Sequence, residues 1–323
     1  MDVNACWRSH PHEWQPLFAD LRAKYPDLTA LHVWPQMGGE RVVGLTLGAQ
    51  ARGEAGRCRS RILIAVPHAH EPACTAAAVD FVHQVLTGAS LDGSPTAFDR
   101  ERILRESVIT VLPDTNTQGR VRSPERCWDG TKYDNDAFLK VAFGVAAGGE
   151  RFGRYPEWRY SEHVPERVGI VYEQVDEDLW VEPNTSRRST HSRMIDSLFE
   201  RYEYTHMLDM HQHEGDEAAL LPGDFELQSE ERQAIIRAWG LALIEAWRKA
   251  GANPRPEPSI PYRGQPRQQF FIDFWKGRCP GMFRLVSEVR NNRHSKTGTP
   301  TPMEHQFRMT STAIAATIAF AFA

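Results

Sequence analysis

Two short segments of the sequence carry residues that could bind a metal ion. His68 and Glu71 follow the apolar run RILIAVP with the spacing HxxE, and His211 closes the run THMLDMH. Two imidazoles, one carboxylate and a water molecule form a known catalytic arrangement around zinc. His70 and His213 are alternative ligands, because histidines two residues apart on a strand share one face. The spacing therefore predicts a metal site but does not by itself choose the histidines.

The elements that must position these residues alternate between strand and helix patterns. Short β-rich runs predict strands at 30–35, 41–48, 61–67, 107–113, 205–211 and 283–289. Helical patterns occupy 14–26, 73–88, 191–202, 229–251 and the residues from 303 onward. This alternation predicts an α/β fold, a mixed, mostly parallel sheet flanked by helices on both faces. No linker divides the chain, so we expect a single domain over residues 1–323, with an irregular stretch from about 114 to 185.

In open α/β sheets, ligands bind beyond the carboxyl ends of the strands. His68, Asn116 and His211 each follow or close a predicted strand, and Glu288 lies within the late strand FRLVSEV. A lone glutamate in such an apolar strand is energetically expensive unless its charge has a partner or a task. We therefore expect these polar side chains to meet at one edge of the sheet.

The order of these segments resembles the zinc carboxypeptidase (funnelin) family. The similarity runs from about residue 14 to 320 and rests on LFADLRAKYP, VVGLTLGA, RILIAVPHAHEP, ITVLPDTNTQGR, MLDMHQHEG and LVSEV. It implies an α/β/α sandwich that binds one Zn²⁺ per chain through His68, Glu71 and His211. It also implies that Glu288 is the catalytic general base, since zinc lowers the pKa of bound water and a carboxylate can take its proton.

The resemblance extends to residues that would contact the substrate. The segment ERCWDGTKYDNDAF aligns without gaps with the family's arginine and asparagine motif. It implies that Arg126 stabilises the oxyanion, with Arg120 and Arg122 as close alternatives, and that Asn135 binds substrate. At the next position the family has an arginine that holds the terminal carboxylate, and this chain has Asp136.

An acid at that position would change the substrate preference. Asp136 would repel a carboxylate by several kcal/mol in a pocket of low dielectric, and it would attract an amine. The segment FFIDFW resembles the lining of the family's specificity pocket, so Asp273 would add a second negative charge. Tyr262 lies in PYRGQPRQQ, which resembles the family's mobile cover. We therefore expect a zinc hydrolase acting on a small amide or peptide whose leaving amine lacks a free carboxylate and can be basic.

Three alternatives stay open at this stage. The first is a carboxypeptidase in which Arg122, Arg263 or Arg267 has taken over carboxylate binding. The second is a barrel amidohydrolase, suggested by the two HxH pairs but disfavoured by the small number of predicted strands. The third is a zinc-binding relative without catalytic activity, which the presence of all four expected catalytic groups argues against.

Composition narrows the class of protein. A formal charge of −4 argues against a general nucleic-acid-binding protein, which needs a basic surface. The longest apolar run, TAIAATIAFAFA, has twelve residues and is too short to span a bilayer. Five cysteines at unpatterned spacings and the lack of a signal-like start predict reduced thiols in the cytoplasm. The expected partner is thus a small substrate, neither nucleic acid nor membrane, and the sequence does not predict an oligomeric state.

Overall fold

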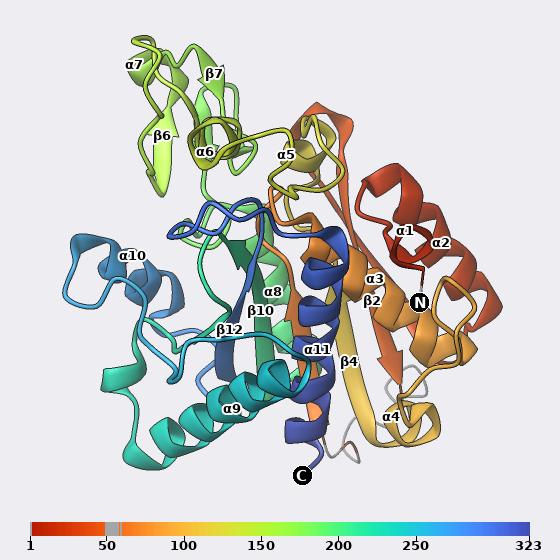
Figure 1. Cartoon of the computed structure of the whole chain (residues 1–323). Coiled ribbons are helices and arrows are strands. Elements are labelled where there is room, and N and C mark those ends of the chain that lie inside the picture. Colours follow the sequence, from red (N-terminus) through yellow and green to blue (C-terminus); the bar gives the residue numbers. More distant parts are fainter. Residues whose placement is uncertain (1, 49–57, 59) are drawn as a thin grey trace.

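A seven-stranded sheet forms the centre of the protein (Figure 1). The computed structural model describes residues 2–48, 58 and 60–323. The strands lie in the order β1 (Thr29–Pro35), β2 (Arg41–Gly48), β4 (Ser107–Leu112), β3 (Ser60–Ala65), β10 (His206–His213), β12 (Phe283–Arg290) and β11 (Ala218–Leu220). The four strands β4, β3, β10 and β12 run parallel to one another, and β1, β2 and β11 add antiparallel pairings. The predicted mixed sheet with a parallel centre is confirmed.

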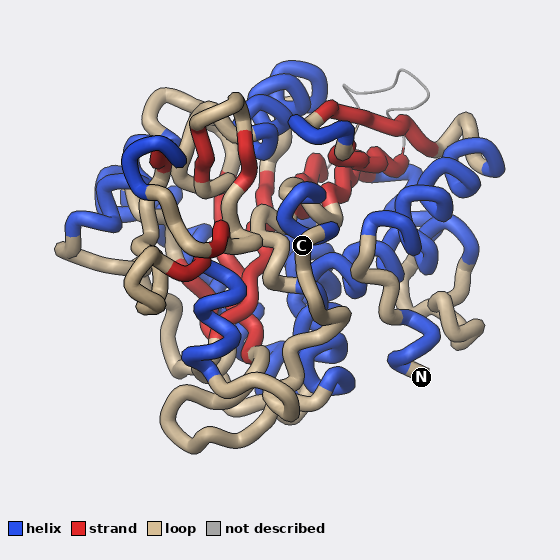
Figure 2. The backbone as a smooth tube through the Cα atoms, turned by 90° about the horizontal axis from the view of Figure 1, so that it is seen from above, coloured by secondary structure: helices blue, strands red, loops and turns tan. Residues whose placement is uncertain are grey.

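Helices cover both faces of this sheet (Figures 1 and 2). Four helices pack on one face around Phe18, Val79, Trp239 and Ile314, and these helices are α2 (Pro11–Lys24), α3 (Pro72–Thr87), α9 (Glu230–Lys249) and α11 (Met303–Ala321). The opposite face packs against α8 (Thr190–Tyr202). Shorter helices are α1 (Val3–Cys6), α4 (Arg100–Glu106) and α10 (Pro266–Trp275). The architecture is the expected α/β/α sandwich. Within the described residues, every helix is either too short or too polar to cross a membrane.

The stretch predicted to be irregular folds into a set of short elements. Its helices are α5 (Thr117–Val121), α6 (Asn135–Phe143) and α7 (Tyr160–His163). One small sheet pairs β5 (Gly144–Val145) with β7 (Arg167–Val168), and another orders β6 (Glu157–Arg159), β9 (Leu179–Val181) and β8 (Glu173–Gln174). We call residues 135–182 the small lobe, which stands at the top of Figure 1. Strands of two or three residues are too short to show an alternating pattern, so the sequence did not reveal them.

Asn116 joins the small lobe to the central sheet. Its side-chain amide donates to the carbonyl groups of Ile170 and Val171, at 3.1 and 2.9 Å, and its Oδ1 accepts from the backbone N–H of Gly119. Gly119 lies so close to the lobe that a Cβ atom there would come within 2.0 Å of the Ile170 carbonyl oxygen. Asn116, one of the polar strand-end residues, thus fixes the lobe above the carboxyl ends of the parallel strands.

Candidate metal centre

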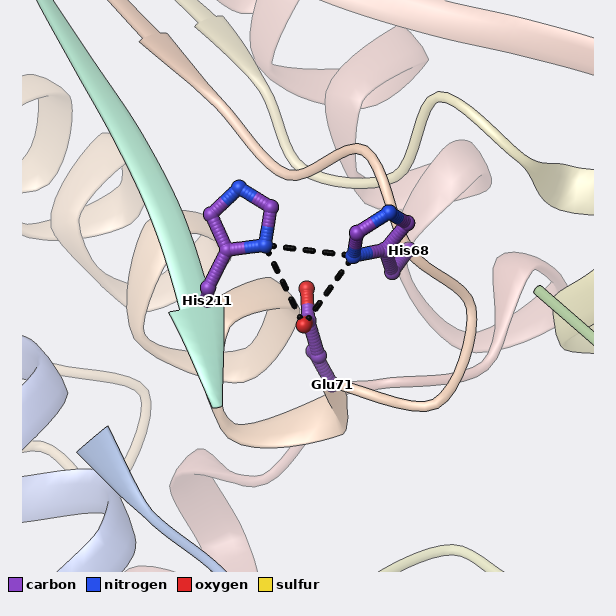
Figure 3. Close-up of side chains that lie close together, drawn as sticks. All are labelled: His68, Glu71 and His211. Atoms are coloured by element: carbon purple, nitrogen blue, oxygen red, sulfur yellow. Dashed lines mark hydrogen bonds and ion pairs between the residues drawn. The ribbon is translucent and has the colours of Figure 1, made fainter. Parts of the chain in front are cut away.

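Three side chains from different elements meet at the carboxyl edge of the sheet (Figure 3). His68 follows β3, Glu71 is the N-cap residue of α3, and His211 lies near the end of β10. His68 Nδ1 and Glu71 Oε1 are 3.1 Å apart, His211 Nδ1 lies 3.1 Å from His68 Nδ1, and it lies 3.2 Å from Glu71 Oε1. Donor atoms at this spacing match the ligand triangle around an ion with bonds of about 2.0–2.2 Å.

The outer nitrogens of both imidazoles are already engaged. His68 Nε2 donates to Asn184 Oδ1 at 3.1 Å, and His211 Nε2 lies 3.2 Å from Asp209 Oδ1. These acceptors favour the tautomers that carry the proton on Nε2, which leaves each Nδ1 with a lone pair. Two lone pairs and a carboxylate then point at one another. In the metal-free protein a proton on His211 relieves that repulsion: burial alone would lower the pKa of His211, but Glu71 and Asp209 raise it well above its usual value. A metal ion can take the place of this proton, so the residues present fit a metal ion.

Glu71 is built to supply a charge at this point. It is 2% exposed and makes no capping hydrogen bond with α3, and its Oε2 atom is buried without a hydrogen-bond partner. Burial alone would raise the pKa of its carboxyl, but the neighbouring His211 and His68 hold that pKa well below the usual range. Glu71 is therefore ionised, with a second oxygen free to bind a ligand. The N–H of Ala73 in α3 is capped instead by Gln212 Oε1, at 2.9 Å.

The alternative histidines lie outside this triangle. His70 is buried between the ring of His68 and the rings of Phe138 and Phe143, and its Nε2 is 3.7 Å from Glu71 Oε1. His213 Nε2 bonds instead to the backbone carbonyl of Asp216, at 2.8 Å. Among the described residues, the group of acids, histidines and cysteines close enough to share an ion contains His68, Glu71 and His211 alone.

A cavity of about 640 Å³ opens onto the triangle. Glu288 lies in its wall, because β10 and β12 pair in parallel with Glu288 directly beside His211. Apolar side chains of the cavity lining include Leu220, Ile260 and Phe271, and Tyr262 also lines the cavity. The site thus combines three metal-ligating atoms, one further carboxylate and room for a small organic molecule.

Glu288 has the environment of a base that is not permanently ionised. Its Oε2 is buried without a hydrogen-bond partner. Burial raises the pKa of Glu288 to about 8, the positive His211 counteracts this shift, and the negative Glu71 and Glu214 add to it. A bound cation would lower this pKa, since a positive charge favours the carboxylate.

The structure does not bring Arg126 to the cavity. Its side chain is 40% exposed and donates to the backbone carbonyls of Asn4 and Trp7 near the N-terminus. The alternatives are also committed elsewhere. Arg120 is fully buried against Ser9, and Arg122 donates to carbonyls of the small lobe. The structure thus places the guanidinium of Arg126 against the N-terminal segment and away from the cavity.

Of the four residues expected to bind substrate, Tyr262 lines the cavity, and the other three lie elsewhere. Asn135 bonds to Asn292 and Arg293, and Asp136 is 73% exposed on α6 with Lys140 as its ion-pair partner at 3.2 Å. Asp273 is exposed on α10 and accepts from Gln269. None of these three lines the cavity, whereas Tyr262 does. The acidic substrate pocket inferred from Asp136 and Asp273 is absent from the described part of the cavity wall.

The sequence analysis missed two residues close to His68, Glu182 at the end of the small lobe and Asn184 just after it. Glu182 is 1% exposed and accepts from Arg154 at 2.7 Å and from Arg267 at 2.8 Å. Burial would raise the pKa of Glu182, but the two arginines hold it well below the usual range. Asn184, two residues further, orients His68. The motif EPN follows a strand of only three residues, so no pattern in the sequence marks it.

Comparison with solved structures identifies the fold of this chain. No protein-family model matches the sequence, and no curated protein matches it. Solved structures do. Carboxypeptidase A from Helicoverpa armigera aligns with a TM-score of 0.61 at 12% identity, over 97% of this chain and 73% of the other. Thrombin-activatable fibrinolysis inhibitor aligns at 0.60 and 14%, over 100% and 75%. The chain has the metallo-carboxypeptidase fold.

A bacterial structure agrees with this assignment. The metallo-carboxypeptidase from Burkholderia cenocepacia aligns with a TM-score of 0.56 at 14% identity, over 96% of this chain and 69% of the other. The predicted metallo-carboxypeptidase fold is thus confirmed, and identities this low show the fold alone. In this fold the ligand triangle lies at the carboxyl ends of the parallel strands, as the sheet rule predicts.

We predict that the chain binds one zinc ion through His68, Glu71 and His211. A double variant, His68→Ala with His211→Ala, should lose the ion, as measured by elemental analysis after dialysis. The matched control is His70→Ala with His213→Ala, which should keep it, because neither side chain joins the triangle. Stoichiometric zinc in the first variant would contradict the assignment.

The raised pKa of Glu288 gives a prediction for the metal-free protein. A carboxyl whose pKa rises from about 4.5 to about 8 on folding binds a proton more tightly in the folded state. Below about pH 4.5 the carboxyl is protonated in both the folded and the unfolded state and does not lower stability. Between about pH 4.5 and 8 it lowers the free energy of unfolding progressively, because the unfolded state releases the proton more readily. Above about pH 8 this reduction stays constant. Glu288→Gln should therefore raise the melting temperature of the metal-free protein increasingly across that range. A melting-temperature difference that does not change with pH would contradict this assignment.

Proposed function

We propose that this chain is a zinc-dependent hydrolase that cleaves an amide bond in a small molecule or peptide. The observation that carries the proposal is the buried triangle of His68, Glu71 and His211, with Glu288 beside it in the same cavity. When bound, a zinc ion would lower the pKa of a water molecule to near neutrality, and the ion would also polarise the carbonyl group of the substrate. The neighbouring carboxylate supplies the general base that such chemistry needs.

Glu288, Asn184 and Asp209 have distinct roles in the proposed reaction. Glu288 takes a proton from the attacking water and later passes it to the leaving amine. Asn184 and Asp209 keep the imidazoles of His68 and His211 turned with Nδ1 toward the ion. The apolar wall of the cavity excludes bulk water, which strengthens every electrostatic interaction inside it.

The cavity lining bears on the amine half of the substrate. The expectation of an amine without a free carboxylate rested on Asp136 and Asp273, which lie outside the cavity. Arg151 and Arg255 line the cavity, and neither has an ion-pair partner among the described residues. Two guanidinium groups in the cavity lining that form no ion pair within the described residues favour a substrate with a carboxylate. This supports the second candidate, a carboxypeptidase with a relocated clamp, although none of Arg122, Arg263 and Arg267 supplies it.

We predict that Glu288→Gln keeps its zinc and loses at least about a hundredfold in kcat, the usual scale for general acid–base help. Turnover and metal content are measured on the same preparation. The change is nearly isosteric and removes only the ability to take a proton. Turnover close to that of the wild type, with zinc bound, would show that another group is the base.

A second prediction distinguishes the two substrate classes. Matched acylated peptides that end in a carboxylate, an amide or an amine are compared on the wild type. If the arginines form the clamp, the carboxylate substrate is preferred, and Arg151→Gln with Arg255→Gln raises its KM about tenfold or more.

The control for this second prediction is Asp136→Asn. It should leave kcat and KM for all three substrates unchanged, because Asp136 is exposed and paired with Lys140. If the amide or amine substrate is preferred and Asp136→Asn removes that preference, the sequence-derived proposal is restored.

A further inference from the structure

Glu214 is an acid of the cavity lining that has no role in the proposed metal chemistry. It follows β10 directly, and it lies outside the group of donor atoms close enough to share an ion. The residue is half-buried, and its carboxylate forms no hydrogen bond or ion pair with any other described residue. An acid withdrawn from water without a partner is energetically costly. The carboxylate of Glu214 is therefore available to a ligand.

Arg151 lies within electrostatic range of Glu214 without pairing with it. Burial raises the pKa of the Glu214 carboxyl, and the positive Arg154 and Arg151 counteract this shift. Arg154 is already paired with Glu182. Arg151 is exposed, lines the same cavity and forms no ion pair within the described residues. Its guanidinium is therefore also available to a ligand.

Arg255 brings a second unpaired guanidinium to this part of the cavity. Its backbone N–H donates to the carbonyl of Glu217 at 2.8 Å, and its Nη2 would lie 3.3 Å from a Cβ atom added to Gly215, the residue after Glu214. Like Arg151, it forms no ion pair within the described residues. One acid and two arginines thus border the same part of the cavity, and none of them has an ion-pair partner in the described part of the chain.

This set of charges matches the two ends of a zwitterion. Guanidinium groups bind a carboxylate through paired hydrogen bonds, and a carboxylate binds an ammonium group. A ligand with a carboxylate alone would leave Glu214 without a partner and would be repelled by its charge. An α-amino acid carries an ammonium and a carboxylate on one carbon atom, so it satisfies the acid and the arginines together.

We propose that the cavity binds the free α-amino acid end of its substrate, with the carboxylate on Arg151 and Arg255 and the ammonium on Glu214. This inference rests on the proposed function and narrows its substrate class. Because both α-groups stay free, neither can belong to the amide bond that is cleaved. The scissile amide therefore lies in the side chain of that amino acid, as in a γ-glutamyl amide or an Nε-acyl-lysine. Hydrolysis adds one water molecule across this C–N bond and leaves the α-carbon unchanged.

The metal centre is within reach of a molecule held in this way. Glu214 is three residues beyond His211, so their Cα atoms are at most about 11 Å apart. The cavity of about 640 Å³ contains both residues in its lining, and a volume of this size holds a small organic ligand. One amino acid can therefore occupy the charged site with its α-groups and place its side-chain amide beside the triangle.

The first test compares free and blocked substrates on the zinc-loaded wild type. The probes are γ-glutamyl butylamide and Nε-acetyl-lysine, each with a free α-amine and each as its Nα-acetylated form. For at least one probe, kcat/KM of the free form should be at least about tenfold higher, because acetylation removes the ammonium charge. Zinc content and turnover of ordinary peptide amides are measured alongside, so that a failure of the proposed function is seen separately. Turnover of peptide amides with no preference for the free forms overturns the inference.

The second test measures binding by calorimetry and needs no turnover. The ligand is norleucine, an α-amino acid with an unreactive side chain, added to the zinc-loaded protein. Glu214→Gln should bind norleucine at least about tenfold more weakly than the wild type, and it should not bind Nα-acetylnorleucine more weakly. Any contact of the amino acid with zinc is common to both proteins and cancels in the comparison. Equal norleucine affinity, an equal loss for both ligands, or no norleucine binding by the wild type overturns the inference.

The matched control is Glu200→Gln. It removes the same charge from an exposed position on α8 outside the cavity lining, so it should bind norleucine as the wild type does. Circular dichroism checks that Glu214→Gln folds, as expected for a carboxylate without a partner. If that variant does not fold, the wild type alone decides the matter, and equal rates for the free and Nα-acetylated probes overturn the inference.

Discussion

The structure depends on one electrostatic constraint, the meeting of three electron-rich atoms in a buried space. His68 Nδ1, His211 Nδ1 and Glu71 Oε1 lie 3.1–3.2 Å from one another, although their outer partners direct the imidazole protons to the opposite side of each ring. In the metal-free protein a proton on His211 offsets the repulsion, because Glu71 and Asp209 raise the pKa of His211 well above its usual value, and a bound cation would replace that proton. The fold maintains the arrangement because each of the three residues is anchored by a different rigid element, the end of β3, the start of α3 and the interior of β10.

The parallel centre of the sheet explains why these elements deliver their side chains to one place. β3, β10 and β12 are adjacent and run in the same direction, so their carboxyl ends form a common edge. The register then sets His211 beside Glu288, which puts the proposed base next to a proposed ligand. Burial in this position raises the pKa of Glu288, and a cation would lower it again toward the working range of a base. Metal site and base therefore depend on each other.

The small lobe adds positive charges to the cavity lining. Arg151 and Arg154 belong to it, and Glu182 ties Arg154 to Arg267 of α10. Substrate binding is thus proposed for Arg151 and Arg255, which lie outside the segments that carry the family resemblance. The solved structures with this fold share only 11–14% of their residues with the chain, and no protein-family model matches its sequence.

Hydrophobic periodicity and short spacings in the sequence predict six of the seven strands of the central sheet, its main helices and the polar residues at the strand ends. β11 was missed because its three residues are too few to show a pattern. The sequence predicted His68, Glu71, His211 and Glu288, and the structure brings all four together. The structure does not bring Arg126 and Asp136 to the cavity, since a match in sequence order says nothing about where an exposed side chain points. Arg154 and Glu182 came only from the tertiary structure. Their segments are too short to show a pattern, and their pairing joins residues far apart in the chain, so only packing could bring those charges to the cavity.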